Sequence, residues 1–146
     1  MILRNYVTFT ASCSDDAVWD ENGNIRVPGG QNVSELLQIR LRKSGYTCTN
    51  AVRHHFYGWS FEVAGARGTV WCLVQSGGMG PESWLLICEP RSPGRLFKWR
   101  RLSALADVVK ALDQNFKDDE RISDVLWYTR DEYESIQRDG GTPMPT

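Results

Sequence analysis

Hydrophobic and polar residues alternate along the middle of the chain, the spacing typical of strands with one buried face. In residues 57–63 the aromatic and aliphatic side chains share one face, and Ser60 and Glu62 share the other. Segments 69–75 (TVWCLVQ) and 83–89 (SWLLICE) are apolar on both faces, which predicts central strands covered on both sides. Residues 95–101 (RLFKWRR) alternate again. We therefore predict an antiparallel meander over residues 56–101.

Further strands are predicted outside the meander. Residues 2–11 are rich in β-branched and aromatic residues and predict a strand. Residues 18–19 and 25–27 flank the turn sequence 21–24 (ENGN) and predict a small hairpin. Residues 47–65 predict two short strands or one long bent strand, with Gly58 as a candidate bulge. Residues 124–129 predict a short strand or extended segment.

Three helices are predicted from their apolar spacing and capping residues. In the first, Asn32 is the expected N-cap, Glu35 completes a capping box, and Gly45 provides a left-handed stop. The second begins at about residue 103 and carries apolar residues at helical spacing, namely Leu105, Val108, Val109, Leu112 and Phe116. Thr129 and Glu132 form the capping box of a third, short helix.

The order of these elements predicts an α+β fold in a single domain over residues 1–139. We expect an antiparallel sheet of about five strands, with two main helices packed mostly on one face and a short C-terminal helix. Residues 140–146 are expected to form a flexible tail. The strands that are apolar on both sides leave a second face, which a helix, the Asp-rich loop after residue 13 or another molecule, such as a second copy, would cover.

Composition and charge exclude several functional classes. The 146 residues are 41% hydrophobic and 24% charged, which is ordinary for a globular protein, and the net charge of −1 gives no general attraction to nucleic acid or membranes. No apolar stretch approaches the roughly 20 residues of a membrane span, and no leader pattern is present, so a cytoplasmic location is expected. Six tryptophans are available for a core or a binding face.

The four cysteines are far apart and form no C-x-x-C pair, so we predict free thiols and no zinc site. His54 and His55 are the chain's only histidines. Neighbours on a strand face opposite ways, so His55 is expected on the apolar side, and the two cannot share a metal unless the strand breaks there. His54 is a candidate general base with Glu62 on the same face. No metal or cofactor is predicted.

The densest local charge is basic. Residues 91–101 hold Arg91, Arg95, Lys98, Arg100 and Arg101, interleaved with Phe97 and Trp99. Such a pattern suits single-stranded nucleic acid, but charged residues also protect an edge strand from aggregation. Residues 118–139 hold eight acids and three arginines, so the chain is electrically polarised.

Three functional hypotheses follow, in this order. The first is a non-catalytic protein-recognition domain of the inhibitor, antidote, immunity or escort type, binding through an aromatic and charged sheet surface. Its expected contact residues are Trp59, Arg95, Lys98, Trp99 and Arg100. The second is a small-ligand-binding protein or hydrolytic enzyme with a site near His54 and Glu62. The third is nucleic-acid binding through a basic strand at residues 91–101.

Overall fold

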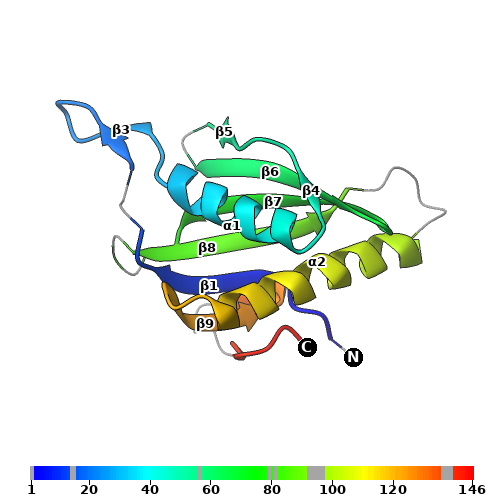
Figure 1. The fold of residues 1–146 in the computed structure, drawn as a ribbon. Helices are drawn as coiled ribbons and strands as arrows, with labels where there is room; N and C mark the ends of the chain where they lie inside the picture. Colours follow the sequence, from blue (N-terminus) through cyan, green and yellow to red (C-terminus); the bar gives the residue numbers. More distant parts are fainter. Residues whose placement is uncertain are drawn as a thin grey trace.

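The computed structural model describes residues 2–13, 16–55, 57–78, 80, 82–91, 98–135 and 140–146, with the backbone alone for 98–101. Figure 1 labels the elements along these ranges. The strands are β1 (Tyr6–Ala11), β2 (Val18–Trp19), β3 (Ile25–Val27), β4 (Thr47–Cys48), β5 (Val52–His54), β6 (Gly58–Gly65), β7 (Gly68–Ser76), β8 (Ser83–Pro90) and β9 (Ile122–Tyr128). The helices are α1 (Gln31–Lys43), α2 (Lys98–Asp118) and α3 (Arg130–Glu134).

The predicted α+β class with a mainly antiparallel sheet and three helices is confirmed. The described residues form a seven-stranded sheet in the order β4-β6-β7-β8-β1-β9, with β5 also pairing with β6, and a separate β2-β3 hairpin. Strands β6, β7 and β8 form the predicted meander. The sheet has more strands than the five expected because the short strands β4 and β5 both pair with β6.

The strand predicted at residues 95–101 is wrong where the structure describes it. Helix α2 begins at Lys98, and residues 92–97 lie outside the described part of the chain. The segment RLFKWRR has no β-branched residue, and Leu, Lys and Arg are good helix formers. Its alternation is too short to distinguish the two-residue period of a strand from the 3.6-residue period of a helix. The basic residues from 98 onward therefore lie on a helix.

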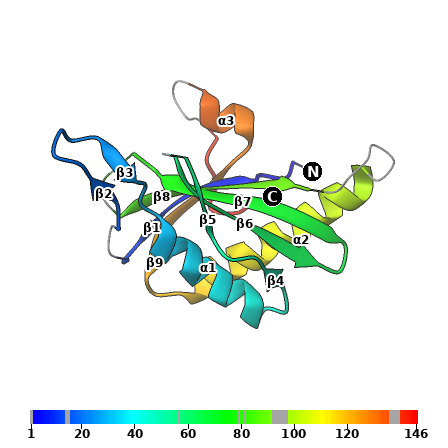
Figure 2. The same ribbon diagram turned by 90° about the horizontal axis from the view of Figure 1, so that it is seen from above.

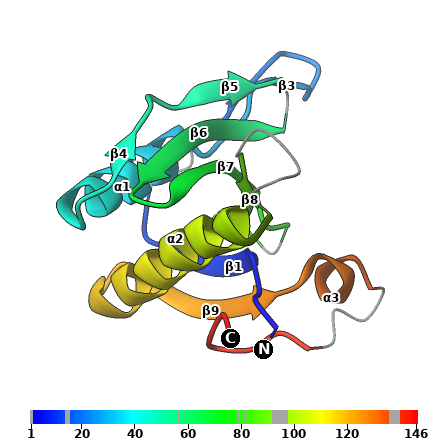
Figure 3. The ribbon, with the colours of Figure 1, turned by 90° about the vertical axis from the view of Figure 1, so that its right-hand side faces the viewer.

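Helices α1 and α2 lie side by side against one face of the sheet (Figures 1 and 3). Their apolar stripes pack against alternate residues of the strands to form the main core. Its largest members include Leu37, Leu41, Leu112 and Phe116 from the helices and Val7, Phe9, Phe61, Val70, Trp84, Leu86 and Trp127 from the strands. In the described part of the chain, no helix combines the length and hydropathy needed to cross a membrane.

The opposite face carries helix α3 and a smaller cluster of rings (Figure 2). Tyr6 of β1, Tyr128 of β9 and Tyr133 of α3 pack together, with ring centroids 5.6 Å and 5.8 Å apart in the two pairs that include Tyr133. Leu85 and Ile87 of β8 complete this cluster. The apolar outer positions of β8 are thus partly covered by the short helix.

The C-terminal residues 140–146, for which the sequence predicts a flexible tail, lie against this edge of the sheet. Thr142 pairs with Trp127, and the carbonyl of Pro145 accepts a hydrogen bond of 2.7 Å from the Arg4 N–H. The capping box of α3 is present as predicted, and its Glu132 also forms an ion pair with Arg4 at 3.0 Å. The two ends of the chain are therefore tied to the same edge.

Gly58 is not the bulge that the sequence predicts. It stands in regular register between His54 of β5 and Gln75 of β7. A Cβ atom at this position would lie 1.9 Å from the carbonyl oxygen of Val74. The chain requires glycine there because the neighbouring backbone approaches too closely for any side chain.

Candidate functional site

The sheet face without the two long helices carries a row of charged and aromatic side chains across its central strands. Glu62 of β6 lies opposite Trp71 of β7, and Trp71 lies opposite Glu89 of β8. Residues paired across antiparallel strands project to the same face. One tryptophan therefore stands between two carboxylates. We call Glu62, Trp71, Glu89 and Arg91 the Trp71 cluster.

Arg91 follows β8 and reaches back over this row. Its Nε lies 3.4 Å from Oε1 of Glu62, and the central carbon of its guanidinium group lies 5.9 Å from the centroid of the Trp71 ring. That distance is at the outer range of a cation–π contact. The side chains of Arg91 and Glu62 are 57% and 43% exposed, so their pairing with each other is weak in water. The guanidinium group can exchange this partner for a carboxylate of another molecule.

A shallow hollow of about 350 Å³ lies beside the ring of Trp71 and is lined by Glu89, Pro90 and Arg91. The indole is half-buried, which leaves part of its surface free to contact another molecule. Binding hot spots are enriched in Trp, Tyr and Arg, and this surface presents Trp71 beside Arg91.

His54 extends the Trp71 cluster toward the edge strand β5. Its imidazole meets the Trp71 ring edge-on, with centroids 5.7 Å apart and an interplanar angle of 68°. The ring of Tyr57 lies 6.4 Å from His54, and Tyr57 is 66% exposed. The aromatic surface thus continues from the centre of the sheet to an exposed tyrosine at its edge.

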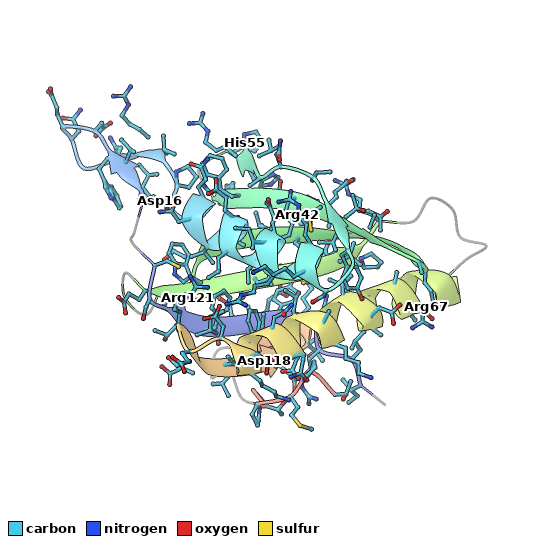
Figure 4. All side chains as sticks on the ribbon, in the orientation of Figure 1. Asp16, Arg42, His55, Arg67, Asp118 and Arg121 are labelled. Carbon is cyan, nitrogen blue, oxygen red and sulfur yellow. The ribbon has the colours of Figure 1, made fainter. Side chains whose placement is uncertain are left out.

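His55 does not point to the apolar side, so that prediction is wrong. Strand β5 ends at His54, and His55 adopts a positive φ of 50° in the following turn, where it is exposed (Figure 4). The two imidazole centroids are 5.4 Å apart. Among the described residues, no group of three or more His, Cys, Asp or Glu side chains could hold a metal ion.

The proposed catalytic pair is not brought together. His54 and Glu62 share a face, as the alternation predicts, but His54 pairs with Gly58, four residues before Glu62 on β6. Four residues of a strand span roughly 13 Å, so the backbone positions of the two residues are well separated. The carboxylate of Glu62 is instead paired with Arg91.

The contact residues expected from the sequence lie in different places. Trp59 points to the other side of the sheet, where its indole N–H donates to the carbonyl of Pro28 at 2.8 Å. Arg95 lies outside the described residues. Lys98, Trp99 and Arg100 form the start of α2, whose first turn contains no acidic residue. A helix N-terminus carries a partial positive charge, so these basic residues add to it.

A second hollow of about 450 Å³ lies toward the β9 side of the sheet. Hydroxyl groups dominate its polar lining, and Asp124 contributes the acid at a positive φ of 54°. The residues around it are Thr8, Phe9, Thr10, Gly77, Ser83, Asp124, Leu126 and Tyr128. A lone carboxylate among hydroxyls offers hydrogen bonding but no paired acid and base.

The sequence does not predict the Trp71 cluster, because residues 69–75 and 83–89 have the apolar pattern of buried strands. On the face away from the two long helices, Trp71 is the largest residue of β7 and Glu89 is the charged residue of β8. Arg91 belongs to the basic segment 91–101 in the sequence. The alternation of Trp71 with Cys72 could have placed the indole on the second face.

Comparisons with known proteins add no relationship to this geometry. No protein-family model matches the chain, and no curated protein or solved structure matches it significantly.

Proposed function

We propose that this chain is a cytoplasmic, non-catalytic recognition domain of the inhibitor, antidote, immunity or escort type, and that it binds a protein partner. The observation that carries the proposal is the Trp71 cluster on the sheet face that α1 and α2 leave uncovered. Trp and Arg are enriched among the residues that dominate binding energy at protein interfaces. The binding surface proposed for this chain is therefore the Trp71 cluster with His54 and Tyr57.

The rigidity of the surface supports this function. Trp71, Glu62 and Glu89 project from three adjacent strands whose opposite face is packed against two helices. A backbone already held in a sheet loses little conformational freedom on binding, so more of the contact energy appears as affinity. The exposed Tyr57 and the cation of Arg91 supply the rim.

The basic first turn of α2 supports an anionic surface on the partner. Lys98, Arg100 and Arg101 lie where the helix dipole is already positive, so a complementary partner would present carboxylates there. The same feature favours nucleic acid as the alternative ligand. Bound nucleic acid would raise the absorbance at 260 nm of the purified protein, and its affinity would fall steeply with salt.

A photo-crosslinking phenylalanine analogue at position 57 tests the protein-binding proposal in cells. Tyr57 is exposed beside the Trp71 cluster, whereas Lys110 is exposed on α2 in the opposite layer and gives the matched control position. We expect a crosslinked protein from position 57 and no equivalent product from position 110. Arg91→Glu should lower the yield of the crosslinked product at least ten-fold.

Equal crosslinking from both positions, or a product that is insensitive to Arg91→Glu, would contradict this surface. A crosslink to RNA or DNA would favour the nucleic-acid alternative instead. Native mass spectrometry of the purified chain distinguishes self-association from binding of a different protein. A dimer whose formation depends on Arg91 would make a second copy of the chain the partner.

A further inference from the structure

Two of the four cysteines face each other in the middle of the sheet. Cys72 of β7 lies directly opposite Cys88 of β8, and their Sγ atoms are 3.8 Å apart. Both residues are fully buried on the helix-covered side. Their separation in the sequence, 16 residues, gave no sign of this contact.

The hydrogen bonds of the sheet identify the kind of pair that they form. The N–H of Cys88 donates to the Asn5 carbonyl at 3.0 Å, and the carbonyl of Cys88 accepts from Nδ2 of Asn5 at 2.7 Å. Both backbone groups of Cys88 are therefore directed away from β7. Two strand positions further on, the Pro90 that faces Val70 has no N–H to donate, and the next residue, Arg91, donates to Thr69 at 2.8 Å.

Cys72 and Cys88 thus occupy a non-hydrogen-bonded pair, in which antiparallel strands bring opposed side chains closest. Cα atoms in such pairs are about 4.5 Å apart, inside the range of roughly 4.4–6.8 Å that disulfides span. At that backbone separation, we expect rotation of the two side chains to bring the sulfur atoms from contact to bonding distance.

We propose that Cys72 and Cys88 form a reversible disulfide site whose oxidant is a low-molecular-weight disulfide such as glutathione disulfide. One cysteine thiol displaces a glutathione thiol and forms a mixed disulfide. The second thiol then attacks the protein sulfur of that bond, so that the S–S bond between Cys72 and Cys88 forms as the second glutathione leaves. Two protein thiols are oxidised, one glutathione disulfide is reduced, and the two thiol protons pass to the two released glutathiones.

Burial controls when this reaction occurs. The pKa of Cys72 is raised well above its ordinary value, first by the hydrogen bond with the Cys88 thiol and second by burial. The reactive thiolate is therefore scarce while the sheet is closed. Exchange therefore proceeds during folding or when β7 and β8 open locally. Once formed, the bond closes a loop of about 15 residues and restrains the unfolded chain, which lowers the unfolding equilibrium constant about a hundred-fold.

The test is refolding from urea in a glutathione redox buffer, followed by alkylation of the remaining thiols and peptide mapping. Trypsin leaves residues 68–91 as one peptide, because no Lys or Arg lies between Arg67 and Arg91, so a second cleavage after Glu82 is needed to separate the cysteines. We expect the link between Cys72 and Cys88 in most molecules, alkylated Cys13 and Cys48, and an unfolding midpoint several degrees above that of the reduced protein.

The double variant Cys13→Ser/Cys48→Ser should retain both the link and the shift in the midpoint. Cys88→Ala should lose both, and Cys72→Ala provides a second variant if that protein folds poorly. The proposal is overturned if all four thiols remain alkylatable at equilibrium in the oxidising buffer. It is equally overturned if Cys72 couples to the half-buried Cys48 as often as to Cys88.

Discussion

At the residue scale, Asp119 is a buried carboxylate that two arginines contact. Its side chain is 3% exposed and contacts Arg121 at 2.9 Å and Arg40 of α1 at 3.1 Å. The hydrogen bonds from Arg121 are the main reason that the pKa of Asp119 is lowered to about 2 from 3.8. This carboxylate joins the end of α2 to α1 and to the start of β9.

We expect Asp119→Asn to lower the free energy of unfolding by about 2 kcal/mol at pH 7, the free energy that corresponds to lowering the pKa from 3.8 to about 2. Because the folded-state pKa is the lower one, this stabilisation is present above about pH 5 and is lost as the pH falls toward 2. Urea titrations of both proteins at pH 7 and pH 2.5, followed by tryptophan fluorescence, measure the difference.

The matched control is Asp118→Asn, since Asp118 is exposed and contacts Gln114 of its own helix. A difference between wild type and Asp119→Asn that stayed constant with pH would contradict the electrostatic explanation. The sequence could not distinguish these neighbours, because DDER presents two adjacent aspartates and the burial of one depends on Arg40, far away in the chain.

At the scale of elements, the start of α1 depends on a loop rather than on the helix's own residues. The helix begins after Gly30, which has a positive φ of 116° and provides no side-chain cap. The carboxylate of Asp16 instead accepts hydrogen bonds from the N–H groups of Gly30 at 2.8 Å and Asn32 at 2.9 Å (Figure 4). The Asn32 cap predicted from the sequence is therefore wrong, since Asn32 already lies within the helix.

We expect Asp16→Ala to cost about 1 kcal/mol, the usual value of an N-terminal cap. Asn32→Ala should change the stability by less than about 0.5 kcal/mol, because alanine donates the same backbone N–H to Asp16. Thermal or urea unfolding of the two variants gives the comparison. A larger loss in Asn32→Ala than in Asp16→Ala would restore the local cap that the sequence suggests.

Local signals predicted the elements whose determinants are near in the chain. The capping box of Thr129 and Glu132, the left-handed Gly45 and the turn around Gly23 are confirmed, because each depends on residues within a few positions. The start of α2 and the cap of α1 could not be predicted in this way. Asp16 accepts a hydrogen bond from Gly30, fourteen residues later in the chain. Residues 98–101 form helical backbone hydrogen bonds although their side chains alternate as in a strand.

At the scale of the whole molecule, α2 orders the charge along its length. Basic residues occupy its first turn, and an acidic run, residues 118–120, begins at its last residue (Figure 4 labels Asp118 near that end). The helix spans about 31 Å. The basic first turn and the acidic run each have the same sign as the helix dipole at their end, and Lys117 offsets part of the acidic charge, so together they add to the electric dipole of the helix. Such a field orients a charged partner during encounter.

We expect Lys98→Glu/Arg100→Glu to raise the free energy of unfolding by about 1 kcal/mol, because acids at a helix N-terminus are favourable. The same change should weaken association with an anionic partner and reduce its dependence on salt. Lys110→Glu, in the middle of α2, is the control. Calorimetry measures the stability and the crosslink from position 57 reports the association; loss of stability in the double variant would contradict the dipole argument.

The site belongs to this largest scale, and for that reason the sequence predicted it only in part. Aromatic and charged character on a sheet face followed from alternation, and so did the shared face of His54 and Glu62. The choice of Trp71 over Trp59 required the pairing order of the strands and the side on which the helices pack. Both depend on contacts between residues that are far apart in the sequence, so no local segment predicts them.

The tie between Arg4 and Pro145 gives the polypeptide an almost closed path. The two termini lie close together in Figures 1, 2 and 3, and the β2-β3 hairpin lies away from them in Figures 1 and 2. A short linker between residues 2 and 146 would therefore convert the chain into a ring with little change in its strands. New ends could then be opened at the tip of that hairpin, around Gly23, with the strand order of the sheet unchanged. The same strand order is therefore compatible with more than one position of the chain ends.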